Sequence, residues 1–447
     1  MIRSFGFLFL LICLAIGGFL AWDSSPPTLQ WVEAPETLGR DTEIVLSVED
    51  EGKGLRSIEV VLVQSGNEHI IFSENYNVPW PWQAGVPRRS FALSPKELFG
   101  KNELSEKEFI VQVNVRDGGA FWLWDNQISQ QRSFRLDLTP PNIEILSKQH
   151  YIRQGGSEAI LYRLSEDAAI SGVKVGNRVF RGFSLSKKDK KTYICLFALA
   201  TEQSLKTTMV IWAQDAAGNR HETNFWIKAL PGRLRKRNIR LSNSLMSRMV
   251  SKILRNTNSV DRKNSVLETF LEINGDLRRS NHRFFEEISR QSAGSLLWDQ
   301  PFLQLSNSQV QSAFADRRSY YYKNKKVDQQ THLGFDLASL AQSPVESAND
   351  GLVVFADYLG IYGNTVFVDH GLGLLSLYGH LSSITVERGA LVKRGDTLGH
   401  TGQTGLATGD HLHFSMVLQG VQVNPLEWWD PTWVEKHVLQ KIQANGQ

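Results

Sequence analysis

Cysteine is almost absent from this chain of 447 residues, which contains only Cys13 and Cys195. Cys13 lies inside an apolar N-terminal segment, so Cys195 has no partner in the same folded region, and a disulfide framework is excluded. A strong charge of either sign is also lacking, because the formal net charge is only +3, and this value gives no argument for a nucleic-acid partner. The composition, with 41% hydrophobic and 21% charged residues, is typical of folded globular protein, and the length suits roughly three domains.

Charge is missing altogether from one stretch near the N-terminus. Ser4 to Trp22 forms a run of 19 uncharged residues directly after Arg3, which is long enough to cross a hydrocarbon core of about 30 Å as a helix. The positive end should stay in the cytoplasm, so we expect residues 1–22 to anchor the protein in the inner membrane, with the remainder exported to the periplasmic or extracytoplasmic side. A cleaved signal peptide is the alternative, although the segment has no clean A-x-A site. Both interpretations place the chain in the cell envelope.

The exported part contains an internal repeat. Asp23-Ser-Ser-Pro-Pro-Thr-Leu29 returns 114 residues later as Asp137-Leu-Thr-Pro-Pro-Asn-Ile143. Each copy continues with apolar residues at every second position between turn residues, as in Ile58, Val60 and Leu62. This period indicates half-buried antiparallel strands, and it predicts two tandem β-sandwich domains, at 23–138 and 139–230. They resemble the immunoglobulin-like modules of bacterial surface proteins. We expect them to be spacers, and binding of the wall or of envelope protein partners is the alternative.

A helical linker or insert is predicted over residues 231–299. It begins with the basic run Arg233–Arg237, which we expect to be a solvated face, with contact to anionic lipid or acidic wall polymer as the alternative. Leu245, Met249 and Ile253 then recur at every fourth position, the spacing of an apolar helical face. Such an insert is expected to pack on the last domain or on its twin in another chain.

Two further helices are predicted within this insert. Ser265 and Glu268 have the spacing of a capping box, so a helix should begin there and end at Asn274-Gly275. Asn281 is then expected to cap a third, short helix.

Histidine concentrates in the last predicted domain, residues 300–435, which precedes a tail at 436–447. Six of the eleven histidines fall between His332 and His413. A catalytic zinc site takes three ligands from His, Asp or Glu and leaves one position for water. His332, Asp336 and His413 would supply two imidazoles and one carboxylate. His411 is two residues from His413 on a predicted strand, so both side chains point to the same side. A pair of polar residues on a solvated strand face is the alternative.

Five motifs in this order carry a resemblance to a known family. They are His332-x-Gly-x-Asp-x-Ala338, Val368-Asp-His-Gly371, Tyr378-Gly-His-Leu381, Gly402-x-Thr-Gly405 and His411-Leu-His-Phe414. Over roughly residues 331–428, the ordered set resembles the lysostaphin-type (LytM-type) zinc endopeptidases that cleave peptidoglycan. Phe335 and His400 depart from the residues that the family often has at these positions.

The resemblance implies a fold, a cofactor and a set of site residues. The chain as a whole is expected to be mainly β, with an antiparallel β-sheet groove in its C-terminal domain. One Zn²⁺ per chain would be bound by His332, Asp336 and His413, and His380 and His411 would be the catalytic histidines. Some relatives have lost ligands and act as regulators of other hydrolases, whereas this chain retains all five residues.

These features predict a zinc-dependent endopeptidase that hydrolyses peptide cross-links of bacterial peptidoglycan. No glutamate stands beside a ligand histidine as in H-E-x-x-H enzymes, so a histidine should act as the base. We assign this role to His411, and to His380 the orientation of the water or the stabilisation of the oxyanion; an exchange of the two roles stays open. The alternatives are a non-catalytic wall-binding regulator that activates another hydrolase, and a zinc peptidase acting on proteins.

Overall fold

The computed structural model describes residues 25–76, 85–100, 107–118, 125–165, 168–185 and 191–443. The predicted anchor at residues 1–22 lies outside these ranges. Within them, no helix combines the length and apolar character needed to cross a membrane. The chain forms two compact units, one reaching to Pro141 and including Gln214–His221, the other comprising Asn142–Ala213 and everything from Glu222 onward.

The first unit is built from two β-sheets around one core. One sheet has three strands, in the order β1 (Thr28–Glu33), β3 (Ile44–Glu49) and β6 (Arg88–Leu93). The other has five, in the order β2 (Thr37–Leu38), β8 (Gln127–Leu136), β7 (Lys107–Asp117), β4 (Leu55–Gln64) and β5 (Asn67–Asn75). A short helix, α2 (Pro95–Phe99), follows β6. Ile58, Val60 and Leu62, which the alternation placed on one face, are all buried in the core that the two sheets share.

The second unit begins with two four-stranded sheets and a two-stranded parallel pair. The first sheet has the order β14 (Phe183–Ser184), β15 (Thr192–Ala198), β11 (Ser157–Leu164) and β9 (Ile143–Ile145). The second has the order β13 (Arg178–Arg181), β12 (Ile170–Val175), β16 (Met209–Gln214) and β17 (Arg220–Asn224). The pair consists of β10 (Tyr151–Arg153) and β18 (Lys228–Leu230). Cys195 is buried here as a free thiol.

The stretch predicted as a helical insert contains a strand and several helices. The basic run leads into β19 (Lys236–Leu241), which pairs in parallel with β21 (Asp316–Tyr322) of the C-terminal domain. Four helical segments follow: α3 (Asn243–Leu254), α4 (Val266–Glu272), the π-helix η2 (Ile273–Leu277) and α5 (Arg278–Ser289). Ser265 caps α4 as predicted, because its Oγ accepts a hydrogen bond from the Glu268 amide at 3.2 Å.

Two predicted boundaries in this stretch are wrong. Asn274-Gly275 does not end a helix, since η2 continues the chain from α4 into α5. Asn274 is fully buried and its amide donates to Asp328 Oδ2 at 2.7 Å, so a tertiary contact replaces the helix end. Asn281 does not cap a helix either. It lies within α5, where its Oδ1 accepts from the Ile361 amide at 3.0 Å.

The C-terminal domain is organised around an eight-stranded sheet. Its order is β20 (Gln309–Ser312), β23 (Phe335–Ala338), β31 (Leu412–Leu418), β27 (Leu374–Leu381), β26 (Gly363–Asp369), β25 (Gly351–Leu359) and β29 (Leu391–Val392), with β32 (Val421–Val423) also paired to β31. A three-stranded sheet combines β19, β21 and β22 (Lys325–His332), and another combines β24 (Pro344–Glu346), β30 (Thr397–His400) and β28 (Ser383–Ile384). A short 3-10 turn, η3 (Gly360–Tyr362), joins β25 to β26. The chain ends in α6 (Pro425–Trp429), α7 (Pro431–Val434), the π-helix η4 (Glu435–Leu439) and α8 (Gln440–Gln443).

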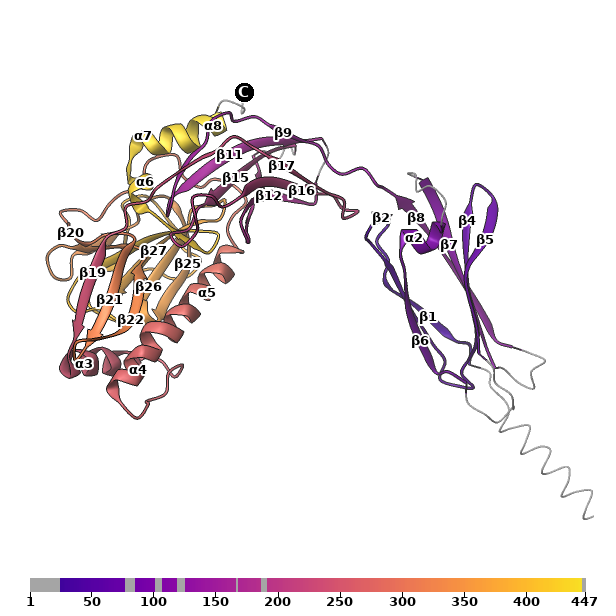
Figure 1. The fold of residues 1–447 in the computed structure, drawn as a ribbon, viewed down its shortest axis with the longest axis horizontal. Helices are drawn as coiled ribbons and strands as arrows, with labels where there is room; N and C mark the ends of the chain where they lie inside the picture. Colours follow the sequence, from indigo (N-terminus) through magenta and orange to yellow (C-terminus); the bar gives the residue numbers. More distant parts are fainter. Residues whose placement is uncertain are drawn as a thin grey trace, which may run out of the picture. The chain divides into compact units, whose positions relative to one another are not determined.

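Both faces of the eight-stranded sheet are covered within this unit. Helices α3 to α5 pack on one face, where Phe285 contacts the same core as Phe367 and Val417, and Figure 1 shows α5 running beside β25 and β26. The other face shares one continuous core with β11, β15 and the C-terminal helices. The insert therefore packs on the last domain of its own chain, one of the two arrangements that the sequence left open.

Candidate active site

Three strand ends bring the predicted metal ligands together. His332 is the last residue of β22, Asp336 lies in β23 and His413 lies in β31. Asp336 and His413 are direct cross-strand partners. His332 Nε2 lies 2.9 Å from Asp336 Oδ1, His413 Nδ1 lies 3.0 Å from the same oxygen, and the two ring nitrogens are 3.1 Å apart. One ligand atom from each residue thus converges on a single point, within 4.8 Å of the other two.

The hydrogen bonds around these residues fix the tautomers of both histidines. His332 Nδ1 lies 3.0 Å from the Ala313 carbonyl, which only accepts, so Nδ1 carries the proton and Nε2 is free. The Ser415 hydroxyl donates to the Leu333 carbonyl at 2.7 Å, so its oxygen accepts from His413 Nε2 at 3.0 Å, and His413 Nδ1 is free. Three acceptors then face one another with no proton among them. Such an arrangement favours a bound metal cation, and its His/Asp/His donor set with every ligand atom in reach fits a zinc ion.

Burial favours the neutral form of His413. His332 and His413 are both 5% exposed. Burial, more than the neighbouring His332, lowers the pKa of His413 to about 4, so the ring is neutral near pH 7. Burial alone would raise the pKa of Asp336, but the charge and hydrogen bonds that His332 and His413 offer when they carry a proton hold it well below its usual value. Asp336 is therefore a carboxylate and His413 a neutral imidazole, the protonation states in which these side chains bind metal.

His380 and His411 lie beside this group. Their rings are 4.9 Å apart between centroids, and His411 Nε2 is 3.6 Å from Asp336 Oδ1. His380 Nδ1 donates to the Thr404 carbonyl and His411 Nδ1 donates to the Gly409 carbonyl, each at 2.8 Å. In neutral rings these bonds leave Nε2 unprotonated on both residues. Both histidines thus present a free Nε2, but burial, followed by the neighbouring His411, holds the pKa of His380 well below its usual value.

The backbone at His380 is unusual. Its φ angle is +65°, in the left-handed region that non-glycine residues rarely adopt. This backbone conformation is fixed because His380 belongs to β27 and its ring is hydrogen-bonded to the Thr404 carbonyl. Such strain is characteristic of residues whose side chain has a functional orientation.

A pocket of about 430 Å³ opens in front of the five residues, all of which line it. Part of its opposite wall is α3, through Leu245 and Met249. The Lys252 ammonium, one turn further along α3, donates to the Gln403 carbonyl at 3.0 Å and to the Ala407 carbonyl at 3.3 Å. The loop that α3 contacts is the same loop whose Thr404 carbonyl holds His380, so the insert helps to position a site residue.

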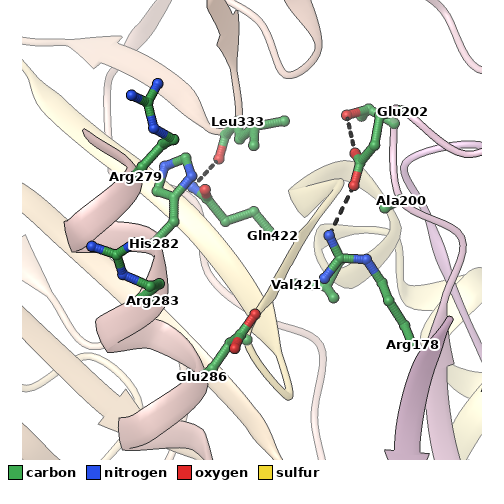
Figure 2. Close-up of a pocket in the computed structure, with 12 residues that line it drawn as sticks. Arg178, Ala200, Glu202, Arg279, His282, Arg283, Glu286, Leu333, Val421 and Gln422 are labelled. Atoms are coloured by element: carbon green, nitrogen blue, oxygen red, sulfur yellow. Dashed lines mark hydrogen bonds and ion pairs between the residues drawn. The ribbon is translucent and has the colours of Figure 1, made fainter. Parts of the chain in front are cut away.

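A second pocket, of about 390 Å³, lies behind the ligands between α5 and the β31–β32 turn. Figure 2 shows Gln422 at its base with its amide donating to the Leu333 carbonyl, and His282 beside it. The same Gln422 amide lies 3.2 Å from Ser415 Oγ, the oxygen that orients His413. Burial lowers the pKa of His282 to about 3, so this ring stays neutral next to the ligand shell.

The remaining histidines of this domain lie outside the pocket. His370 is fully buried, with Nδ1 2.7 Å from the Asp350 carbonyl and Nε2 2.7 Å from Ser376 Oγ. His400 contacts Ser383 Oγ at 3.0 Å in the three-stranded sheet. Both histidines make local contacts away from the pocket.

Several site residues were not singled out by the sequence. The Arg318 guanidinium donates to Asp336 Oδ2 at 3.0 Å, and Arg237 of β19 lies in the wall of the same pocket. Ser415 follows His413 by two residues on β31, so the strand period would have placed it next to that ring. No sequence pattern placed Arg237 near the site, because its position depends on the pairing between β19 and β21.

Comparison with known proteins identifies relatives of this region. Residues 330–425 match the sequence profile of peptidase family M23. The chain is 39% identical over 101 residues to the DD-carboxypeptidase/endopeptidase Mpg of Neisseria meningitidis serogroup B (strain ATCC 13091 / M2091), covering 23% of each protein. It is 38% identical over 96 residues to the peptidoglycan DD-endopeptidase ShyA of Vibrio cholerae, covering 22% of each. The alignments thus span less than a quarter of these relatives, and the family resemblance expected from the motifs is confirmed for this domain.

Solved structures also align with parts of this chain, at low TM-scores. A peptidase M23 structure from Pseudomonas aeruginosa aligns with 62% of this chain and 94% of its own, at 21% identity and a TM-score of 0.38. The catalytic domain of lysostaphin from Staphylococcus simulans aligns with 28% of this chain and 94% of its own, at 26% identity and a TM-score of 0.25.

Proposed function

Because residues 330–425 form a peptidase M23 domain of the LytM type, we propose that this protein is a zinc-dependent endopeptidase that hydrolyses peptide cross-links of bacterial peptidoglycan. One observation carries the proposal. Three unprotonated acceptor atoms converge, and two further histidines present free Nε2 atoms to the same pocket. The names of the relatives in Neisseria and Vibrio point to the same substrate class.

The roles of the side chains follow from their contacts. His332 Nε2, Asp336 Oδ1 and His413 Nδ1 would hold one zinc ion, which when bound would polarise the scissile carbonyl and acidify a water molecule. His411 Nε2 would take the proton from the attacking water and deliver it to the leaving amine. His380 Nε2, fixed by Thr404 through Nδ1, would orient that water or stabilise the developing oxyanion. Arg318 would hold Asp336 in its ligating rotamer.

The place of action follows from the substrate. Peptidoglycan lies in the extracytoplasmic cell envelope, so the enzyme would work there. Anchoring by residues 1–22 in the inner membrane, and contacts of the β-sandwich domains with envelope proteins, belong to the proposal as well. A non-catalytic regulator is the alternative, but the complete residue set and the pocket in front of it favour the enzyme.

The test uses the purified full-length chain on isolated peptidoglycan, with and without a chelator. Zinc-dependent release of peptide products is expected, and its loss in His413→Ala together with the loss of bound zinc, with the fold retained by circular dichroism, would assign the ligand. His400→Ala is the matched control, since this histidine lies outside the pocket. Absence of zinc-dependent products from the folded wild-type protein would contradict the enzymatic proposal.

A further inference from the structure

The charge of the metal-site pocket is strongly positive. Of the described residues that line it, three are arginines, Arg237, Arg278 and Arg318, and Asp336 is the single carboxylate. Asp336 is itself a ligand candidate, and a divalent cation would more than neutralise it. A pocket with this balance attracts a ligand that carries negative charge.

Two of these arginines stand side by side. Arg237 of β19 and Arg318 of β21 are register partners in a parallel strand pair, and both line the pocket. Arg318 is paired with the Asp336 carboxylate, whereas Arg237 contacts only the Ser312 hydroxyl and the Gln311 carbonyl, so its charge has no carboxylate partner among the described residues. Arg278 differs, because its guanidinium is bonded to the carbonyl and the side chain of Asn274 within its own helix.

The contacts of the two guanidiniums place them next to the reacting centre. Arg318 Nη2 lies 3.0 Å from Asp336 Oδ2, whose other oxygen is a ligand atom, and Arg318 Nε has no hydrogen-bond partner. Arg237 Nη1 lies 2.7 Å from Ser312 Oγ, and Ser312 is the cross-strand partner of Asp336. Both cations are thus anchored at Asp336 or its neighbour, with donors left over.

We propose that Arg237 and Arg318 form a carboxylate subsite that selects peptides with a free α-carboxylate on the residue released at the amine side of the scissile bond. The proposal rests on the proposed hydrolase function and adds its specificity. A planar carboxylate matches the guanidinium fork, which Lys would not reproduce. In an α-peptide bond the residue on the acyl side uses its α-carboxyl group in the scissile bond itself, so a free α-carboxylate adjacent to such a bond belongs to the leaving residue.

The subsite therefore acts by position. Because successive residues of a chain are about 3.8 Å apart, a carboxylate on the leaving residue lies within one residue of the scissile carbonyl. Arg318 contacts the ligand residue Asp336 directly, and Arg237 is the register partner of Arg318. Arg237 and Arg318 would be positioning residues that recognise the substrate, while proton transfer remains with the histidines. The sequence predicted that the basic run Arg233–Arg237 is a solvated face. The proposed subsite gives one residue of this run, Arg237, a role in substrate recognition.

The experiment compares two synthetic peptides that differ only at the leaving residue, which ends in a free carboxylate or in a carboxamide. The full-length zinc-loaded protein is assayed as wild type, Arg237→Gln, Arg237→Lys and Lys236→Gln. Lys236→Gln is the matched control, because it removes the same charge one residue away and outside the pocket. The wild type should prefer the carboxylate by about ten- to hundredfold in kcat/KM, the range for a lost charge-assisted hydrogen bond.

Arg237→Gln should lose most of this preference through a higher KM for the acid, and Arg237→Lys should recover only part of it. Lys236→Gln should behave as the wild type. Calorimetric titration with a product-like N-acyl amino acid and its amide gives a second readout, in which Arg237→Gln should lose the preference for the acid. Equal turnover of acid and amide by the wild type, or an unchanged ratio in Arg237→Gln, would overturn the subsite while leaving the hydrolase intact. Zinc-dependent cleavage of neither peptide nor of peptidoglycan would instead overturn the proposed function.

Arg237 is exposed, so its replacement should not unfold the protein. Should Arg237→Gln nevertheless unfold, Ser312→Ala serves in its place, because it removes the hydrogen bond that anchors the guanidinium and keeps the charge. A smaller preference for the acid in that variant supports the subsite, and an unchanged preference contradicts it.

Discussion

Gly334, in the middle of the first motif, should be required for metal binding because of the space it leaves for His413. A Cβ added at this position would lie 2.5 Å from Ser415 Oγ and 2.6 Å from both Cε1 and Nε2 of His413, whereas ordinary contacts begin at 3.4 Å. The imidazole would have to retreat by about 0.8 Å, the difference between 3.4 and 2.6 Å. Metal–ligand distances tolerate only about 0.2 Å, so His413 would lose its place as a ligand.

Gly334→Ala should therefore lower zinc affinity about 10- to 100-fold, or about 1.4 to 2.7 kcal/mol, the range seen when the support of a ligand is lost. The measurement is a titration of zinc against a chromophoric chelator, with circular dichroism to verify the fold. Gly409→Ala is the matched control, because it introduces the same methyl group near His411 where no atom lies within 4 Å. Wild-type zinc affinity in Gly334→Ala would refute the reasoning that Gly334 and Ser415 together position the ring.

Two further predictions concern stability. Burial raises the pKa of Glu427 from 4.5 to about 8, so the folded protein keeps a proton that the unfolded chain releases, and stability should fall as pH rises from about 4.5 to 8. Glu427→Gln should flatten this slope in urea unfolding measured at several pH values, and an unchanged slope would contradict the assignment. A fragment of residues 300–447 should be insoluble or fail to unfold cooperatively, because it lacks β19 and the helices that cover one face of the eight-stranded sheet. A soluble fragment that unfolds cooperatively would show that β19 and these helices are dispensable for folding.

The site residues were predicted from the order of the sequence motifs and, for one pair, from strand spacing. Two-residue spacing put His411 and His413 on one side, and the structure brings both toward the pocket that His332, Asp336 and His380 also line. The tautomers could not be read in the same way, because they depend on carbonyls such as that of Ala313, which no spacing places near a ring.

Long-range pairing explains most of what the sequence did not reveal. Arg237 reaches the pocket because β19 pairs with β21 across the whole insert, a contact with no periodic signature. Asn274-Gly275 has the composition of a helix end, but the buried amide of Asn274 finds Asp328 and the helix continues. In both cases a tertiary contact overrides a local preference.

The core that joins β11 and β15 to the eight-stranded sheet has a practical consequence for anyone who wishes to transplant the catalytic module. Ser157 donates from both its amide and its hydroxyl to Glu427, and Glu158 is held by Lys441 Nζ at 2.7 Å. A graft cut just before the histidine motifs would sever these ties and expose apolar surface, whereas one that starts at Asn142 keeps them whole. The smallest portable piece of this protein is therefore much larger than the stretch that its relatives share with it.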